Sequence, residues 1–382
     1  MTPAARVQAA AEILDRIGAG APAEQALTNW ARGARYAGSK DRAAVRDHVF
    51  DVLRRWRSTA VAGGAATGRG RMLGLLRQTG GDVAALFSGE GHAPAPQSDE
   101  EAAAGAPATG PDALDLPDWL IPLFESSLGS EALAVAEAMR HRAPAFLRVN
   151  LLRGDVPRAI ASLAEDGIAA RAHPLAATAL EVTEGARGIA RSRAYETGLV
   201  ELQDAASQAV VAALPLVHGM RVLDFCAGGG GKALAMAALL RGPVEAHDAD
   251  PRRMSDLPAR ARRAGAVVEP VSAPRGQYDL VLCDVPCSGS GAWRRSPEGK
   301  WALDAARLDA LRATQAAILD EVSTLVRPGG TLAYATCSVL TPENDAQIDA
   351  FLGRHGSWSD GARHRFLPGD GGDGFFLARL TR

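Results

Sequence analysis

The sequence predicts an α/β protein whose doubly wound sheet follows a small α+β subdomain and an all-α N-terminal module. From residue 221 onward, short apolar stretches alternate with helical patterns, which is typical of a sheet covered by helices on both faces. Over residues 4–57, apolar residues instead recur at helical spacing. With 382 residues the chain is long enough for two or three such modules.

Composition shifts along the chain indicate the boundaries. Residues 89–111 consist largely of Gly, Ala, Pro, Ser and acids without periodicity, which predicts a flexible linker. The expected segments are a helical module, a linker, an α+β subdomain and the doubly wound domain, over residues 1–88, 89–112, 113–210 and 211–382. In the last segment we expect strands at 222–225, 244–247, 266–271, 279–283, 331–335 and 374–380, with helices after 231, after 251, near 303–326 and after 342.

Composition also limits the class of protein. Apolar residues make up 47% and charged residues 23% of the chain, as in ordinary soluble proteins, and no apolar run is long enough for a membrane span. The N-terminus lacks an apolar signal core, so we expect a cytoplasmic protein. The four cysteines have neither disulfide-like nor zinc-like spacing, which predicts reduced thiols and no metal site. Residues 1–90 carry 13 basic against 8 acidic side chains, a hint of an anionic partner.

A glycine-rich turn joins the first strand of the doubly wound domain to a helix. It reads Asp224-Phe-Cys-Ala-Gly-Gly-Gly-Gly-Lys232, and its glycines allow a ligand close to the backbone and to the free amides of the helix. A phosphate-binding loop is excluded because Ala233 replaces the required Ser or Thr. Asp248, at the end of the next strand, could bind a ribose in a dinucleotide or in S-adenosylmethionine. Asp224 would repel a pyrophosphate but suits the cationic methionine end of S-adenosylmethionine, which favours a methyltransferase over a dinucleotide-binding protein, with a structural glycine turn as the more distant alternative.

Two cysteines follow the ends of two buried strands. Cys287 lies in Asp284-Val-Pro-Cys-Ser-Gly-Ser-Gly291, and Cys337 follows Ala335-Thr336. We expect Cys283, within its strand, and Cys226 to behave mainly as small buried hydrophobic residues. A thiolate beside a methyl donor has a definite use, because its addition to carbon 6 of a cytosine makes carbon 5 nucleophilic. Asp284 would hydrogen bond the polar edge of the base, and a second thiol can assist its release.

These motifs together resemble those of the NOP/Sun family of RNA cytosine-5 methyltransferases. The family's D-x-C-A-A-P-G-G-K and D-A-P-C-S-G-T-G are similar to residues 224–232 and 284–291. Further matches, in the same order, are Gln203-Asp-Ala-Ala-Ser-Gln208, Arg294-Arg-Ser-Pro297, Lys300-Trp301, Thr336-Cys-Ser338, Pro342-Glu-Asn344 and Asp373-Gly-Phe-Phe376. The resemblance covers about 260 residues and implies a Rossmann-like class I methyltransferase domain.

The resemblance also implies roles that the residues alone leave open. It makes Cys337 the nucleophile and Cys287 the thiol needed for product release, with Asp284 where cofactor and base meet. It places S-adenosylmethionine along the turn and Asp248 on its ribose; the turn residues concerned are Asp224, Cys226, Ala227, Gly228, Gly229, Gly230, Gly231 and Lys232. Two departures stand out: Gly228-Gly229 replaces Ala-Pro, and residues 271–273 lack the family's acid near the adenine.

Residues 1–88 are similar to the helical RNA-binding module of the NusB antitermination factor, as fused to a bacterial enzyme that methylates small-subunit ribosomal RNA. The resemblance implies phosphate contacts for Arg42, Arg46, Arg54, Arg55 and Arg57. Beyond the Pro-Cys loop we expect Arg294, Arg295 and Lys300 to hold phosphates of the target.

The sequence therefore predicts a monomeric S-adenosylmethionine-dependent methyltransferase that forms 5-methylcytosine in ribosomal RNA. The expected substrate is the 16S rRNA of the small subunit. The target base would have to leave its helical stack to be reached. The alternatives are a transfer RNA cytosine-5 methyltransferase, with the same catalytic core, and a non-catalytic RNA-binding or ribosome-assembly factor.

Overall fold

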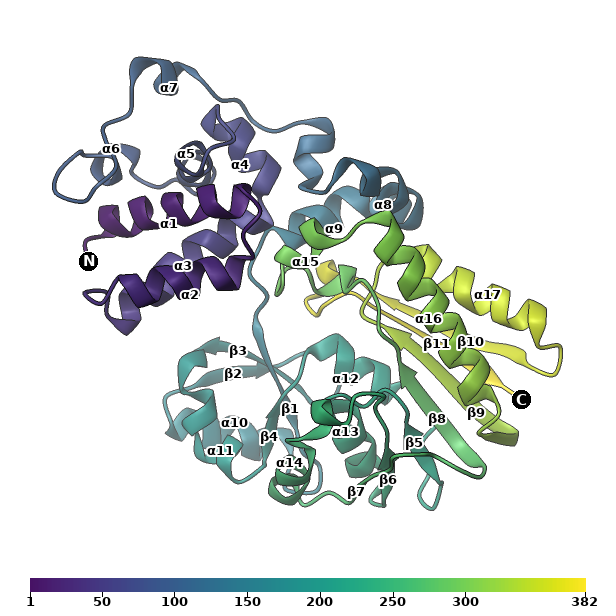
Figure 1. Cartoon of the computed structure of the whole chain (residues 1–382). Helices are drawn as coiled ribbons and strands as arrows, with labels where there is room; N and C mark the ends of the chain where they lie inside the picture. The colour runs from purple at the N-terminus through teal and green to yellow at the C-terminus, as the bar shows by residue number, and fades with distance from the viewer. The chain divides into compact units, whose positions relative to one another are not determined.

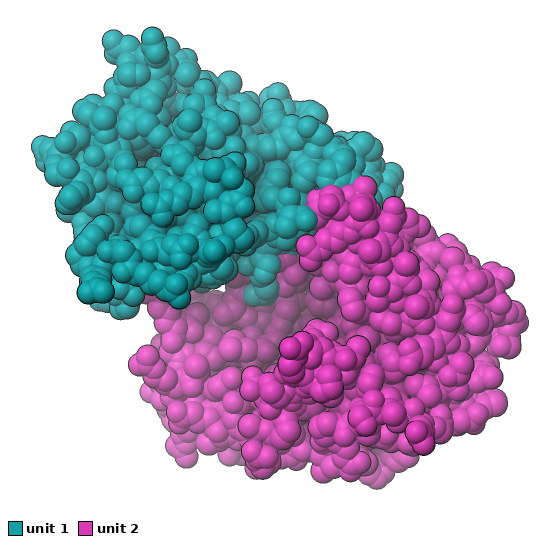
Figure 2. All heavy atoms as spheres, viewed as in Figure 1, with its two compact units in different colours: residues 1–142, 293–302 teal, residues 143–292, 303–382 magenta.

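All 382 residues are described by the computed structural model, and they divide into two units (Figure 2). Unit 1 contains residues 1–142 and 293–302, and unit 2 contains residues 143–292 and 303–382. The chain therefore passes between the units three times. Short helices of residues 113–142, which we expected in the α+β subdomain, belong to unit 1.

Unit 1 is helical, as the apolar spacing predicted. Val7, Leu14, Val45, Val49 and Val52 are all buried in its core, and full burial of such a side chain stabilises the fold by about 1.5–3 kcal/mol. Its α-helices are α1 (Pro3–Gly18), α2 (Ala23–Gly33), α3 (Ser39–Arg54), α4 (Trp56–Gly63), α5 (Gly68–Thr79), α6 (Val83–Leu86), α7 (Asp99–Ala103), α8 (Ile121–Leu128), α9 (Ala132–Met139) and α15 (Glu298–Ala302). Short 3₁₀ turns are η1 (Gly110–Leu114), η2 (Asp118–Leu120) and η3 (Gly129–Glu131).

The segment expected to be a free linker contains structure of its own. Ser98 caps α7, and the Glu101 carboxylate pairs with the Arg69 guanidinium at 2.6 Å. Arg77 also donates to the carbonyl of Ala104 at 2.8 Å. The prediction of a flexible linker did not anticipate these contacts, because a low-complexity segment can still be held by side chains from a neighbouring helix.

Unit 2 begins with a four-stranded antiparallel sheet, ordered β2-β3-β1-β4. Its core is formed by buried residues such as Leu147, Leu163, Leu180 and Val200, so the predicted α+β region is confirmed. Its elements are β1 (Ala145–Val149), α10 (Val156–Glu165), β2 (Ala169–Ala172), β3 (Ala179–Glu184), η4 (Ala186–Arg191), α11 (Arg193–Glu196) and β4 (Val200–Leu202).

A seven-stranded sheet completes unit 2, in the order β10-β11-β9-β8-β5-β6-β7 (Figure 1). The five strands from β9 to β7 in this order run parallel, and β11 and β10 are antiparallel additions. The strands are β5 (Val222–Asp224), β6 (Val244–Ala246), β7 (Val268–Pro270), β8 (Tyr278–Asp284), β9 (Val326–Thr336), β10 (Ser359–Phe366) and β11 (Phe375–Thr381). Strand β10 was not predicted, because its sequence SDGARHRF is polar and lacks an apolar alternation.

Helices cover both faces of this sheet. In β8, Leu280 and Leu282 pack toward α12, α13 and α14, whereas Val281 and Cys283 pack toward α16 and α17, because successive side chains of a strand point to opposite faces. The helices and turns are α12 (Ala205–Ala212), α13 (Gly231–Leu240), η5 (Pro251–Met254), α14 (Leu257–Ala264), η6 (Ser290–Ala292), α16 (Ala305–Ser323), η7 (Thr341–Glu343), α17 (Asp345–Arg354) and η8 (Pro368–Asp370). The doubly wound prediction is confirmed.

None of the helices combines the length and apolar character that crossing a membrane requires.

Candidate active site

The glycine turn between β5 and α13 has the strand, turn and helix that the sequence predicted. Gly228 and Gly230 adopt left-handed backbone angles, with φ of 51° and 78°, which side chains rarely allow. A Cβ on Gly230 would also lie 2.2 Å from the side chain of Leu257. Helix α13 starts at Gly231 without a side-chain cap, so its first amides are available at the turn.

Two arginines that we had not singled out hold this turn in place. Arg148 is 4% exposed and donates to the carbonyl of Gly231 at 3.0 Å. Arg260 donates to the carbonyl of Gly229 and pairs at 3.0 Å with the buried Glu201. These contacts join residues distant in the sequence, so no local pattern could have revealed them.

Asp248 lies beside the turn, directly after β6. One of its carboxylate oxygens accepts the amide of Gly228 at 2.8 Å, and the other accepts the amide of Asp250 at 3.0 Å. The Arg253 guanidinium pairs with the same carboxylate at 3.0 Å. The acid predicted to bind a ribose is thus fixed against the glycine turn.

Asp224, at the end of β5, is a buried carboxylate without a hydrogen-bond partner on either oxygen. Burial raises its pKa to about 7, although the nearby Lys232 ammonium acts in the opposite direction. An unpaired buried carboxylate is costly, so this position favours a cationic ligand group.

Lys232, in the first turn of α13, forms an ion pair with Asp284 at 2.5 Å. Burial by itself would lower the pKa of Lys232, but the Asp284 carboxylate outweighs this and raises it. Lys232 therefore stays protonated and holds Asp284 at the end of β8. The resemblance placed both residues at the cofactor, and the direct pair between them is an addition from the structure.

The two predicted reactive cysteines meet at the carboxyl edge of the sheet. Strands β8 and β9 are parallel neighbours with Asp284 opposite Ala335, so the loops that follow them leave the sheet side by side. The Sγ atoms of Cys287 and Cys337 are 3.3 Å apart, and both cysteines are free thiols. The contact with Cys337 and burial raise the pKa of the Cys287 thiol well above its usual range, so Cys287 is protonated at neutral pH.

The other two cysteines are inert in this structure. Cys283 is fully buried in β8, and burial raises its pKa well above the usual range. Burial also raises the pKa of the Cys226 thiol, and the carboxylates of Asp224 and Asp284 add to this effect. Neither thiol ionises readily, as expected for small buried side chains.

A buried glutamate, Glu343, connects the two cysteine loops. Its carboxylate accepts the amide and the hydroxyl of Ser288, at 2.8 and 2.5 Å, and the hydroxyl of Ser338 at 2.6 Å. Each serine directly follows a reactive cysteine. Gln315 of α16 donates both to Glu343, at 3.0 Å, and to the carbonyl of Pro286, at 2.9 Å. Sequence reasoning noted Glu343 only as part of a motif, which was the one available signal.

Several arginines predicted to meet phosphates have other roles. Arg54 is 5% exposed and donates to the carbonyl of Arg294 and to Asp51, so its prediction was wrong. Arg294 and Lys300 are also buried in unit 1, whereas Arg295 is exposed. The remaining arginines with side-chain partners are Arg42 with the Ala37 carbonyl, Arg46 with Glu24, and Arg57 with Asp112 and Asp118.

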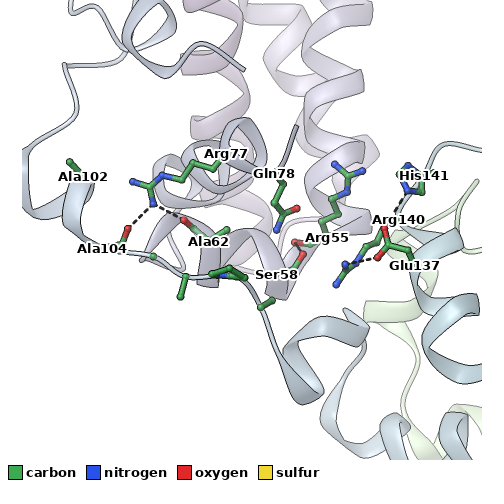
Figure 3. Close-up of a pocket in the computed structure, with 14 residues that line it drawn as sticks. Arg55, Ser58, Ala62, Arg77, Gln78, Ala102, Ala104, Glu137, Arg140 and His141 are labelled. Atoms are coloured by element: carbon green, nitrogen blue, oxygen red, sulfur yellow. Dashed lines mark hydrogen bonds and ion pairs between the residues drawn. The ribbon is translucent and has the colours of Figure 1, made fainter. Parts of the chain in front are cut away.

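Unit 1 contains a separate cavity of about 650 Å³ (Figure 3). Arg55, Arg77 and Arg140 are among its lining residues, but none of the predicted catalytic or cofactor residues is. Arg77 donates to the carbonyls of Ala62 and Ala104, and Arg140 pairs with Asp115 and Glu137. Arg55 is therefore the one of the three arginines without a side-chain partner. This cavity is not the active site.

Fold and site together define a class of protein. A parallel sheet with a glycine turn after one strand and an acid after the next binds an adenosine-type cofactor at its carboxyl edge. The unpaired carboxylate of Asp224 suits a cation rather than a pyrophosphate. The chain therefore has the Rossmann-like fold of a methyltransferase.

Comparisons with known proteins agree with this class. Residues 211–381 match 16S rRNA methyltransferase RsmB/F, and residues 116–187 match the ferredoxin-like domain of RsmF/B-like methyltransferases. Ribosomal RNA small subunit methyltransferase B of Xanthomonas campestris is 35% identical over 304 residues, which cover 73% of this chain and 69% of that protein. The protein of the same name from Erwinia tasmaniensis is 33% identical over 285 residues, which cover 70% of this chain and 66% of that protein. The crystal structure of PH0851 aligns with 100% of this chain and 99% of its own, at 22% identity and a TM-score of 0.74.

The chain belongs to the RsmB/F family of 16S rRNA methyltransferases. It spans about two thirds of the length of the curated relatives. The family model describes its members as 16S rRNA methyltransferases, and the curated relatives are named ribosomal RNA small subunit methyltransferases.

The residues present fit S-adenosylmethionine. Its ammonium group would meet the unpaired Asp224 carboxylate, its ribose hydroxyls the Asp248 carboxylate, and its methionine carboxylate the amides at the start of α13. Residues 271–273, directly after β7, contain no acid, and the Val271 carbonyl bonds the His247 ring at 3.0 Å.

The raised pKa of Asp224 gives a test of stability against pH. The carboxyl group is protonated below about pH 7 in the folded protein but ionises near pH 4 when unfolded. Stability of the cofactor-free protein should therefore fall between pH 4 and 7. We expect Asp224→Asn to remove about 3 kcal/mol of this loss between pH 5 and 8, measured by urea unfolding at these two pH values. Asp250→Asn, which changes an exposed carboxylate, is the control; equal pH slopes in wild type and Asp224→Asn would contradict the assignment.

Glu343 gives a second test. Glu343→Gln keeps the size of the side chain but replaces an oxygen that accepts serine donors with an amide group that cannot. We expect methyl transfer to RNA to slow by roughly ten- to a hundredfold, the effect of small misplacements of reacting groups, with unchanged affinity for S-adenosylhomocysteine. The control is Glu245→Gln, whose carboxylate pairs with Arg221 and Tyr278. Wild-type rates in Glu343→Gln would show that the carboxylate does not position the thiols.

Proposed function

We propose that this protein transfers a methyl group to carbon 5 of a cytosine in 16S rRNA through a covalent cysteine–cytosine intermediate. The observation that carries the proposal is the 3.3 Å contact between the Cys287 and Cys337 thiols at the sheet edge that also holds Asp284. A methyltransferase acting on oxygen, or on an exocyclic nitrogen, has no use for paired thiols at this place.

Methylation of carbon 5 of cytosine requires a nucleophile that activates the ring, and a thiol can provide it. Carbon 5 of cytosine is too weak a nucleophile to attack a methyl group unaided, and bound S-adenosylmethionine supplies only the electrophilic methyl. Addition of a thiolate to carbon 6 forms a sulfur–carbon bond and turns carbon 5 into an enamine carbon. After transfer, carbon 5 loses its proton and the sulfur–carbon bond breaks.

We assign the nucleophile to Cys337 and the release step to Cys287. Cys287 is protonated at neutral pH, because its pKa is raised by the contact with Cys337 and by burial, so it is poorly suited to attack. Its contact with Cys337 places it beside the bond that must break.

Asp284 would bind the polar edge of the cytosine. The Lys232 ammonium, at 2.5 Å from its carboxylate, offsets the charge of Asp284 and stabilises negative charge that develops on the ring during addition. Both side chains lie at the end of β8 and the start of α13, so the glycine turn and the base site share one wall.

The remaining parts of the chain would hold the RNA. We propose RNA binding for the helical module and for the antiparallel sheet subdomain, with Arg55 and the exposed Arg295 as phosphate contacts. Such contacts position RNA without reading its sequence. We further propose a monomer that works in the cytoplasm, where its ribosomal substrate is.

Thiol variants test the chemistry. Cys287→Ala should accumulate a protein–RNA adduct that survives denaturing gel electrophoresis, because the intermediate forms but is not released. Cys337→Ala should give no adduct, since the sulfur–carbon bond cannot form. Cys283→Ala combined with Cys287→Ala should behave like Cys287→Ala alone. An adduct in Cys337→Ala would reverse the two roles.

Base-resolved mapping of 5-methylcytosine tests the substrate. We expect cells without the gene to lose one site in small-subunit rRNA, as the family predicts. Loss confined to transfer RNA would keep the chemistry and replace the substrate, and no loss at all would support a non-catalytic assembly factor.

A further inference from the structure

The chain segment Trp293–Ala302 has an unusual place in the molecule. It follows the loop that carries Asp284 and Cys287 after a single residue, Ala292, yet it is built into unit 1 with the helical module. Trp293 and Lys300 are each 2% exposed there. Trp301 packs against the core formed by α1, α2, α3 and α5.

Glu298 of this segment caps the start of α2. The helix begins after Pro22, which provides no side-chain hydrogen bond to the free amides. The Glu298 carboxylate accepts the amide of Ala23, the first residue of α2, at 2.9 Å. A carboxylate at a helix N-terminus is favoured both as a hydrogen-bond acceptor and by the helix dipole.

The same segment caps the end of α3. The last carbonyls of a helix have no intrahelical donor. Trp301 donates its indole N–H to the carbonyl of Leu53 at 2.8 Å, and the Lys300 ammonium donates to the carbonyl of Arg54 at 2.9 Å. A cation is the favoured charge at this end of a helix.

Arg54 of α3 in turn donates a hydrogen bond to the segment. Its guanidinium, 5% exposed, donates to the main-chain carbonyl of Arg294 at 2.7 Å. The segment is thus held by hydrogen bonds in both directions, which involve Arg294, Glu298, Lys300 and Trp301. Four of the ten residues in the segment thus form hydrogen bonds that fix it to the helical module.

The loop before the segment is fixed in unit 2 up to the junction. Gly291 donates its amide to the carbonyl of Cys337 at 2.9 Å and accepts the amide of Gly374 at 2.8 Å. Only Ala292 separates this anchor from Trp293. The chain therefore passes from this anchor in unit 2 to the first residue of the segment in unit 1 through a single residue.

We propose that the helical module holds the downstream end of the Cys287 loop, and that Glu298, Lys300 and Trp301 are positioning residues for product release. This inference rests on the proposed function, and it gives the module a role in the chemistry besides binding RNA. A loosened loop would leave Cys337 free to attack while Cys287 is misplaced, so the covalent intermediate would persist.

The test is the double variant Glu298→Ala/Trp301→Phe, made in the full chain with both reactive thiols intact. Phe keeps the ring in the core but cannot donate to Leu53, and Ala removes the cap of α2. We expect kcat for RNA methylation to fall about tenfold or more, with an unchanged KM for S-adenosylmethionine. A denaturant-stable adduct should accumulate, and amides of residues 284–292 should exchange faster with deuterium.

Controls separate positioning from folding and from the proposed chemistry. Glu298→Gln keeps an oxygen acceptor and, unlike Glu298→Ala, should retain most of the wild-type rate. If the double variant does not fold, Trp301→Phe alone is measured in its place. Glu12→Ala, which removes an exposed hydrogen bond with Gln8 in α1, should have wild-type kcat. A lower melting temperature with unchanged kcat, adduct level and loop exchange would overturn the inference. Failure of Cys287→Ala to trap any adduct would overturn the proposed function instead.

Discussion

The parallel pairing of β8 with β9 is the constraint on which the site depends. With Asp284 opposite Ala335, the loops that carry Cys287 and Cys337 leave the same edge of the sheet at the same level. Pairing alone brings the loops close, and the Glu343 carboxylate then joins the residues that follow each cysteine. The 3.3 Å contact between the thiols follows from these two features, because each loop is fixed at both its strand and its serine.

Charge is the second constraint, because the proposed cofactor pocket contains more carboxylates than ammonium groups. Asp224 and Asp284 lie near one ammonium, that of Lys232, and Lys232 pairs with Asp284. Asp224 therefore remains without a partner in a buried place, where its carboxylate is destabilising. Under the proposed binding mode, a cofactor that brings a cation would resolve this imbalance and link binding to local stability.

Sequence reasoning succeeded where the signal is local and failed where partners are distant. The glycine turn, the strand ends and the helical periodicity of unit 1 could be predicted because each depends on residues close in the chain. Arg54 was assigned to phosphates from the resemblance of the helical module, and Lys300 from its place after the Pro-Cys loop. In the structure they bond main-chain carbonyls of residues more than 200 positions away. The polar strand β10 was missed because its pairing with β11, not its own pattern, makes it a strand.

The sequence by itself determined the doubly wound sheet, the cofactor turn and the thiols at strand ends, since these follow from apolar periodicity, glycine conformations and motif spacing. The tertiary structure alone decided that Lys232 pairs with Asp284, that Glu343 joins the cysteine loops, and that residues 293–302 are built into the helical module. The physical reason is that a buried charge or an unpaired helix end must find a partner. Which residue provides that partner depends on how distant segments pack, and this is not encoded in any local pattern.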